Sequence, residues 1–166
     1  MEFCRGLWDA DESQLDAMAE LYQRAHALIM GRVACEVMSG NFAPAAPRPT
    51  TRGADIFNAA PKVVFSRTLK IADWANTTIA AGDTAEEIDK LRQGGDGHIV
   101  VWGGVSLWRS LMQLDLIDEL QLSLFPYVAG EGTRLFDGVP KSYRLDLVSS
   151  TPSTNGILEL RYRRHR

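Results

Sequence analysis

The sequence has few of the features that mark secreted, membrane-spanning or disulfide-stabilised proteins. It contains only two cysteines, Cys4 and Cys35, and they lack the C-x-x-C spacing of redox and zinc sites, as expected in a reducing compartment. No apolar run approaches the roughly 18 residues of a membrane span, and no signal peptide is recognisable at its start. We therefore expect a cytoplasmic protein with no membrane partner.

Runs of positive charge are also scarce. The formal net charge is −3, and the one basic cluster is RYRRHR at residues 161–166. This cluster is short and terminal, where charged tails are usually solvated, so we expect no nucleic-acid partner. The three histidines have no metal-ligand spacing, and we expect no metal site. With 166 residues, 45% of them hydrophobic, the chain is long enough for one domain spanning residues 1–166.

Hydrophobic periodicity predicts strands that alternate with helices as far as residue 112 and strands alone after it. The predicted helices cover residues 12–25, 33–39 and 106–112, and a further helix begins at Thr84 and has Ile88 and Leu91 on its apolar face. The predicted strands cover 27–30, 62–66, 77–81, 98–102, 119–128, 144–149 and 157–163. The first helix is capped within Asp11–Ser13 and the helix at Thr84 by the capping box Thr84-x-x-Glu87. This order predicts a three-layer α/β/α domain with a mostly parallel sheet and an antiparallel C-terminal hairpin.

Adjacent glycines separate the predicted strand at 98–102 from the helix that follows it. Gly103 and Gly104 lead into Val105, Ser106 and Leu107. Such a pair serves either a tight turn or the close approach of a ligand to the backbone. N–H groups at a helix start carry partial positive charge and bind phosphate. The segment matches neither G-x-G-x-x-G nor a Walker loop, so both interpretations stay open.

Two other strand ends carry groups of the same kind. One predicted strand ends at Gly31 and Arg32, and another ends at Ser66, Arg67 and Thr68. If the strands are parallel, these ends meet at one edge of the sheet, where α/β proteins bind ligands. Arginine suits phosphate because the guanidinium fork matches its oxygens. The alternative is that both arginines are surface residues that pair with acidic side chains.

Four stretches together resemble the dihydrofolate reductase-like superfamily, in the branch that contains the reductase domain of the bifunctional riboflavin-biosynthesis deaminase/reductase. They are LIMGRVACEVM (28–38), KVVFSRTL (62–69), the block from HIVVWGG to TRLF (98–136) and the closing hairpin. Their order and spacing agree with that branch over nearly the whole chain. The resemblance implies the α/β/α fold, a homodimer and a small-molecule substrate.

The resemblance also implies an NADPH site. Gly31 and Arg32 match the pair that meets the cofactor phosphates. The segment Ser66, Arg67 and Thr68 matches the strand end beside the adenosine 2′-phosphate. The corner from Gly103 through Gly104, Val105 and Ser106 to Leu107 matches the backbone under the pyrophosphate.

Two departures from the family pattern concern the helix after Gly31 and the start of the chain. Ala34 and Cys35 stand where the family usually has threonine and an aromatic residue, so one phosphate contact is lost. Members also open with a central strand that lines the nicotinamide and substrate pocket, and residues 1–8 here resemble the loop that follows it. That first strand is therefore missing: either the sequence is truncated at its start, or something else fills the position.

Two functional hypotheses follow. The first is an NADPH-dependent reductase of a small heterocyclic substrate, pteridine- or pyrimidine-like, or of a carbonyl compound. The second is a non-catalytic dimeric nucleotide-binding or interaction domain descended from such a reductase. No catalytic side chain is assigned, since Asp16 and Glu20 on the first helix are better explained as solvated charges.

Overall fold

The computed structural model describes residues 12–44, 54–139 and 142–166. Helices and strands alternate through the first two thirds of this chain, and strands close it, as the periodicity predicts. In chain order the elements are α1 (Glu12–Gln23), β1 (Ala25–Gly31), α2 (Arg32–Phe42), α3 (Ala54–Ala59), β2 (Lys62–Phe65), β3 (Thr77–Ala80), α4 (Thr84–Gln93), β4 (His98–Gly103), α5 (Val105–Gln113), β5 (Glu119–Leu124), β6 (Leu145–Pro152) and β7 (Leu158–Arg164).

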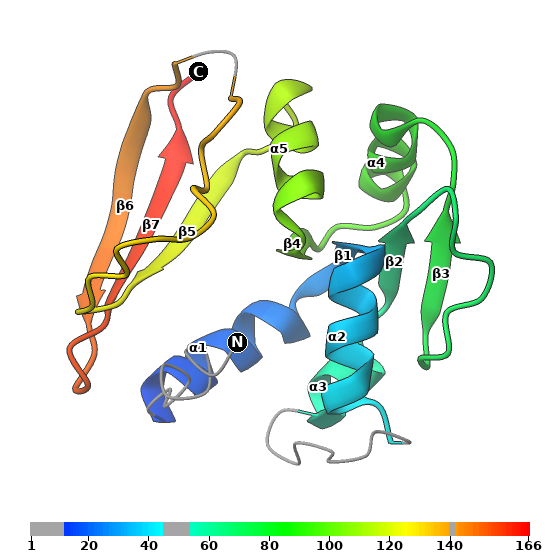
Figure 1. Cartoon of the computed structure of the whole chain (residues 1–166), viewed down its shortest axis with the longest axis horizontal. Coiled ribbons are helices and arrows are strands. Elements are labelled where there is room, and N and C mark those ends of the chain that lie inside the picture. The colour runs from blue at the N-terminus through cyan, green and yellow to red at the C-terminus, as the bar shows by residue number, and fades with distance from the viewer. Residues whose placement is uncertain (1–11, 45–53, 140–141) are drawn as a thin grey trace.

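The first four strands form a parallel sheet in the order β3-β2-β1-β4. Helices cover both faces, with α1, α2 and α3 on one side and α4 and α5 on the other (Figure 1). Strand β1 is the centre of the core because its side chains alternate between the two layers: Leu28 and Met30 pack towards α1–α3, and Ala27 and Ile29 towards α4 and α5. All four are at most 2% exposed. The predicted three-layer architecture is confirmed.

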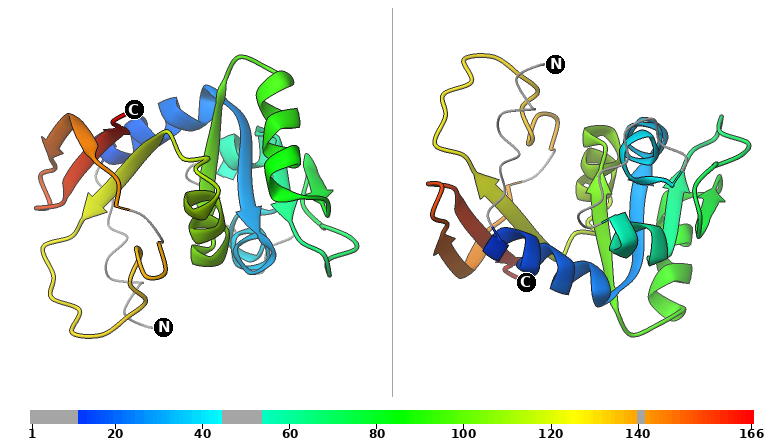
Figure 2. Two further views of the ribbon diagram at one scale, coloured as in Figure 1. Left: turned by 90° about the horizontal axis from the view of Figure 1, so that it is seen from above. Right: turned by 90° about the horizontal axis from the view of Figure 1, so that it is seen from below.

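The last three strands form a separate antiparallel sheet in the order β5-β7-β6. Figure 2 shows it beside the β4 edge of the parallel sheet. The predicted turn at Asn155-Gly156 joins β6 and β7; the Asn155 side chain accepts a hydrogen bond from the Ile157 N–H at 3.2 Å, and Gly156 has φ 84°. The predicted C-terminal hairpin is therefore confirmed.

Several predicted boundaries were wrong for local reasons. Strand β5 ends at Leu124 rather than residue 128, because Pro126 follows and cannot donate to a ladder. The cap of α4 is Asp83, which accepts from the N–H groups of Ala85 and Glu86, and not Thr84. Helix α3 was not predicted, and α2 extends to Phe42 instead of ending at residue 39. Asp11 lies outside the described residues.

A buried lysine donates hydrogen bonds to carbonyl groups at the end of α3. Lys62 is only 1% exposed, and its Nζ donates to the carbonyls of Phe57 at 2.6 Å and Ala60 at 2.7 Å. It also lies 4.7 Å from the centre of the Trp74 ring. Burial lowers the pKa of Lys62 to about 8. The lysine thus satisfies carbonyls that the short helix leaves without partners.

Candidate functional site at the carboxyl edge of the parallel sheet

The three strand ends singled out by the sequence lie together. Because β1, β2 and β4 are parallel and adjacent, their carboxyl ends share one edge. The register places Gly31 beside Phe65, the residue before Ser66, and Met30 beside Gly103. The prediction that the glycine, arginine and hydroxyl groups meet at one edge is therefore borne out by the sheet topology.

Two helices begin at this edge with free backbone donors. The N-cap residues are Gly31 for α2 and Gly104 for α5, and neither has a side chain that caps its helix. Neither helix has an acidic residue in its first turn. Helix α4 differs, because the Asp83 carboxylate accepts from two of its first N–H groups. The first turns of α2 and α5 therefore present unpaired N–H groups and the positive ends of their dipoles.

The two helix starts are neighbours in space. A Cβ atom placed on Gly104 would lie 3.6 Å from the backbone nitrogen of Gly31. In the first turn of α5, Leu107 is buried in the core and Ser106 is exposed. The side chain of Leu107 thus anchors α5 while the backbone of Val105 and Ser106 faces the edge. This arrangement brings two sets of amide donors close enough for one phosphate group or pyrophosphate.

The physical requirement for glycine differs among the three positions at this edge. Gly104 has φ 91°, a conformation that glycine adopts at least cost, so turn geometry alone explains it. A Cβ on Gly103 would approach that of Ala34 to 3.2 Å, which favours a small residue where β4 packs on α2. Gly31 has φ −82° and ψ 165°, which any residue can adopt, and a Cβ there would meet nothing within 4 Å. Of these three glycines, Gly31 is the one at which neither the backbone conformation nor the packing requires glycine.

Arg32 has a partner within its own helix. Its Nη1 donates to both carboxylate oxygens of Glu36, at 2.8 and 3.0 Å, and both side chains are about half exposed. This is the surface pairing that the sequence offered as the alternative to a phosphate contact. The carboxylate of Glu36 also brings negative charge to the helix that a phosphate would approach, which weakens the site.

The Ser66–Thr68 segment makes a tight turn with an arginine at its tip. Ser66 Oγ accepts from the N–H groups of Thr68 at 3.2 Å and Leu69 at 3.0 Å, and lies 3.4 Å from Thr68 Oγ1. Arg67 and Thr68 are exposed. Among the described residues, no hydrogen bond or ion pair engages the Arg67 guanidinium. Arg67 is thus available to an external anion.

Other titratable side chains near the edge offer little chemistry. Asp16 and Glu20 are exposed on α1, as expected of solvated charges. Cys35 is buried in α2, and burial, followed by the charge of Glu36, raises the pKa of its thiol. The thiol therefore stays protonated at neutral pH and is a poor nucleophile. Within the described ranges, no group of acidic, histidine or cysteine side chains could hold a metal ion.

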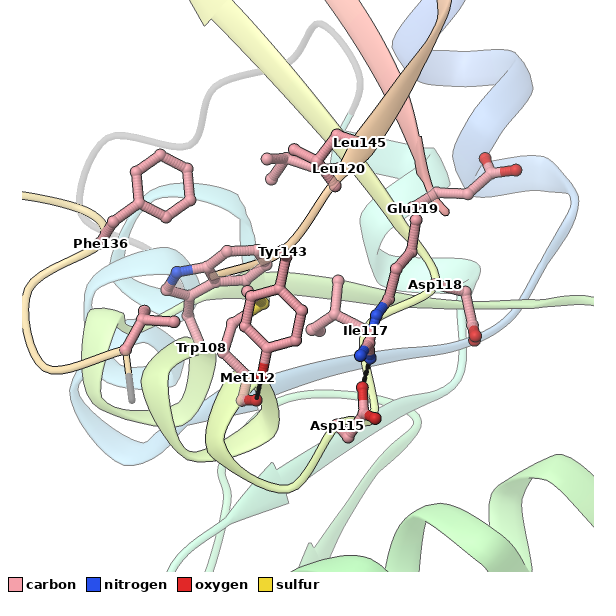
Figure 3. A pocket seen from close by; sticks show the side chains of 12 residues that line it. Trp108, Met112, Asp115, Ile117, Asp118, Glu119, Leu120, Phe136, Tyr143 and Leu145 are labelled. Atoms are coloured by element: carbon pink, nitrogen blue, oxygen red, sulfur yellow. Dashed lines mark hydrogen bonds and ion pairs between the residues drawn. The ribbon is translucent and has the colours of Figure 1, made fainter. Parts of the chain in front are cut away.

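A cavity of about 360 Å³ lies elsewhere, between α5 and the antiparallel sheet, and no sequence pattern indicated it. Its wall is mostly apolar and includes Trp108, Met112 and Phe136. Figure 3 shows Asp115 paired with the arginine at the rim, which is Arg164. Since that pair is already satisfied and no uncapped helix start lines the cavity, we place the candidate phosphate site at the strand ends instead.

The fold is of the dihydrofolate reductase-like class, with helices on both faces of a mostly parallel sheet and an antiparallel C-terminal portion. A family comparison is more specific, since residues 5–158 match the RibD C-terminal domain. The chain belongs to this family, and the resemblance inferred from its motifs is confirmed. In the part of the chain that the structure describes, no helix is long and apolar enough to cross a membrane.

One curated relative matches part of the chain. The uncharacterized protein YyaP of Bacillus subtilis (strain 168) is 36% identical over 102 residues, which are 61% of this chain and 53% of that protein. The matched segment therefore spans about half the length of this relative.

Solved structures share the fold at lower identity. A riboflavin biosynthesis protein from Shewanella sp. PV-4 superimposes with a TM-score of 0.74 at 22% identity, covering 96% of this chain and 82% of that one. The deaminase/5-amino-6-(5-phosphoribosylamino)uracil reductase of Thermotoga maritima gives a TM-score of 0.65 at 16% identity, covering 95% of this chain and 50% of that one.

Proposed function

We propose that this protein is an NADPH-dependent reductase of a small heterocyclic substrate of the pyrimidine type. The observation that carries the proposal is the pair of adjacent, uncapped helix starts after Gly31 and Gly104, with the unpaired Arg67 on the same edge. Membership of the RibD C-terminal family supports the reductase class. The Thermotoga relative is named for the reduction of an aminouracil, which supports a pyrimidine substrate.

The residues present fit a dinucleotide phosphate. The N–H groups of Val105 and Ser106 would hold the pyrophosphate, because they are first-turn donors without a capping side chain. Arg67 would pair with the 2′-phosphate, with Thr68 as a second donor. The open space above Gly31 would let a phosphate oxygen approach the start of α2. When bound, NADPH supplies the hydride, and the chain's part is to orient it at the strand ends.

The non-catalytic alternative has its own support. The Arg32–Glu36 pair withdraws one expected phosphate ligand, and the described side chains at the edge include no candidate proton donor. On this alternative the protein binds the nucleotide without turning it over. We also propose a homodimer, as the resemblance to the reductase family implies.

Two measurements separate these proposals. Titration with NADPH and NADH, followed by quenching of tryptophan fluorescence, tests binding. A charge-assisted contact is worth about 1.5–3 kcal/mol, so Arg67→Ala should lower NADPH affinity by roughly 10- to 150-fold and leave NADH affinity unchanged. Lys70→Ala, which removes an exposed charge three positions away, is the matched control.

Equal affinity of the unmutated protein for the two cofactors would remove Arg67 from the site. Oxidation of NADPH in the presence of an aminopyrimidine, followed by absorbance, then tests turnover. Tight NADPH binding with no oxidation of any substrate in a heterocycle panel would favour the non-catalytic domain.

A further inference from the structure

The basic cluster at residues 161–166 lies against acidic side chains of the chain itself. Most of it belongs to strand β7, and each of its basic side chains has a carboxylate beside it. The pairs are Arg161 and Arg163 with Glu119, Arg164 with Asp115, His165 with Asp146, and Arg166 with Asp118. The cluster is therefore part of the folded domain and not a solvated tail.

Two of these pairs leave the antiparallel sheet. The pairs of Glu119 stay within that sheet, because β5 and β7 are neighbouring strands. Arg164 and Arg166 instead reach Asp115 and Asp118, which lie in the connection between α5 and β5. Helix α5 packs on the parallel sheet. The two pairs thus join the last strand to the helical layer of the other sheet.

Arg164 contacts three different segments. Its guanidinium pairs with Asp115 and lies 4.4 Å from the centre of the Tyr143 ring, and its backbone N–H donates to the carbonyl of Asp118 at 2.9 Å. The Tyr143 hydroxyl donates in turn to the carbonyl of Met112 in α5 at 2.7 Å (Figure 3). Because the Arg164 side chain is only 20% exposed, salt screens its ion pair less than it screens an exposed one.

Asp118 extends the contacts to α4. Its Oδ1 accepts from Arg166, and its Oδ2 lies 3.3 Å from Nη2 of Arg92, in the last turn of α4. One carboxylate thus joins Arg166 to a second helix. All three side chains are at least 40% exposed, so salt should weaken these pairs readily.

The backbone at Asp115 gives independent support for the Arg164 pair. Asp115 follows Leu114, the C-cap of α5, and has φ 64°. Glycine is the usual residue in this left-handed position, and a negative charge at the end of a helix is unfavourable. Aspartate therefore carries two costs at this position, and the ion pair with Arg164 offsets them.

We propose that Arg164 and Arg166 form a salt-bridge network that fixes the antiparallel sheet to the ends of α4 and α5. This network, and not the binding of an external polyanion, is the role of the basic cluster. Salt releases the Arg166–Asp118 pair, whereas the Arg164–Asp115 pair stays closed. The network shares no residue with the strand-end site proposed for NADPH, so either proposal can fail while the other stands.

The test compares two variants of neighbouring residues on β7. Arg164→Gln removes the pair that leaves the sheet, and Arg163→Gln removes the same charge one position earlier, where the pair stays within the sheet. Hydrogen exchange is measured at Leu114 and Leu116, whose N–H groups donate to carbonyls of α5. We expect exchange at least about tenfold faster for Arg164→Gln, which also loses its contact with Tyr143, and within about twofold of the unmodified chain for Arg163→Gln.

A double variant assigns the effect to the ion pair. Asp115→Asn removes the charge and keeps a residue that tolerates the left-handed backbone. Combined with Arg164→Gln, it should accelerate exchange far less than the product of the two separate effects. If Arg164→Gln does not fold, the comparison is made between Asp115→Asn and Asp146→Asn, since Asp146 has its partner, His165, within the antiparallel portion.

Salt separates the two parts of the network. Between about 0.1 and 1 M salt the Debye length falls from about 10 to 3 Å. Exchange at the His165 N–H, which donates to the carbonyl of Arg144, should then rise to the level that Arg166→Gln shows in 0.1 M salt. Exchange at Leu114 should change little.

Three results would overturn the proposal. The first is equal exchange at the end of α5 in the two arginine variants, or in the two aspartate variants. The second is a double variant whose effect equals the product of the single effects, because the two side chains would then act independently. The third is binding of heparin by the unmodified chain at about 0.15 M salt that Arg164→Gln and Arg166→Gln abolish, which would mean that these arginines serve an external polyanion.

Discussion

Replacing Gly31 by alanine should move stability and nucleotide affinity in opposite directions. The backbone at Gly31 has φ −82° and ψ 165°, and an added Cβ would meet no atom within 4 Å. Alanine therefore fits the folded chain without strain and reduces the freedom of the unfolded chain. Such replacements raise the free energy of unfolding by about 0.4–1 kcal/mol.

The same methyl group would stand where a phosphate is expected to approach the start of α2. If it displaces the phosphate from one charge-assisted N–H contact, the loss is about 1.5–3 kcal/mol, which corresponds to roughly 10- to 150-fold in NADPH affinity. The predicted signature is a variant that is more stable and binds less well, which a general structural defect would not produce.

The control lies in the same helix. A Cβ added at Gly40, near the end of α2, would also meet no atom within 4 Å. Gly40→Ala should stabilise the helix by up to about 1 kcal/mol and leave NADPH binding unchanged, since Gly40 lies more than two turns from the helix start.

Unfolding by urea, followed by circular dichroism, gives the stabilities, and fluorescence titration gives the affinities. If Gly31→Ala bound NADPH as tightly as the unmutated protein, the helix start would not contact the cofactor, and the explanation offered for this glycine would be refuted.

Three further predictions concern charge and assembly. Glu36→Gln should free Arg32 and remove a nearby negative charge, so NADPH affinity should rise several-fold in low salt while stability changes by no more than about 0.5 kcal/mol; unchanged affinity would place Arg32 outside the site. Because the pKa of Lys62 is about 8 when folded and about 10.4 when unfolded, the unfolded chain binds more protons between these values. The free energy of unfolding should therefore rise with pH across this window, relative to Lys62→Met, as measured by urea titration; parallel profiles would contradict it. The proposed homodimer should sediment at about twice 18.4 kDa at micromolar concentration, and a monomer alone would argue against it.

The sequence predicted the location of the candidate site, at the carboxyl ends of the parallel strands, better than it predicted the contacts of the individual side chains there. Parallel strands that end in Gly31, Phe65 and Gly103 must present their ends together, and alternation of strands and helices is enough to infer this. The pairing of Arg32 with Glu36 was also available from the sequence, because residues four apart on a helix are neighbours. It was not decisive, since the same arginine fits a phosphate equally well.

Other features depend on contacts that no local pattern contains. The position of Lys62 in the core follows from the way α3 ends against β2, and α3 itself is too short to give a helical period. The cavity beside α5 is formed by segments as distant as Trp108, Tyr143 and Arg164. Distant segments meet only through the packing of the antiparallel sheet, which a pattern of alternating residues cannot specify.

Binding and turnover depend on different parts of this fold. The groups proposed to bind phosphate are in the first turns of α2 and α5 and in the segment that follows β2, and all of them adjoin the described parallel sheet. Within the described residues, β4 pairs only with β1 and β5 only with β7, and the resemblance implies a further central strand that lines the nicotinamide and substrate pocket. Under the proposed function, these described residues would hold the phosphate end of NADPH. Hydride transfer requires an enclosed pocket in addition to a bound cofactor, so the proposed NADPH binding and the proposed turnover depend on different parts of the chain and need separate tests.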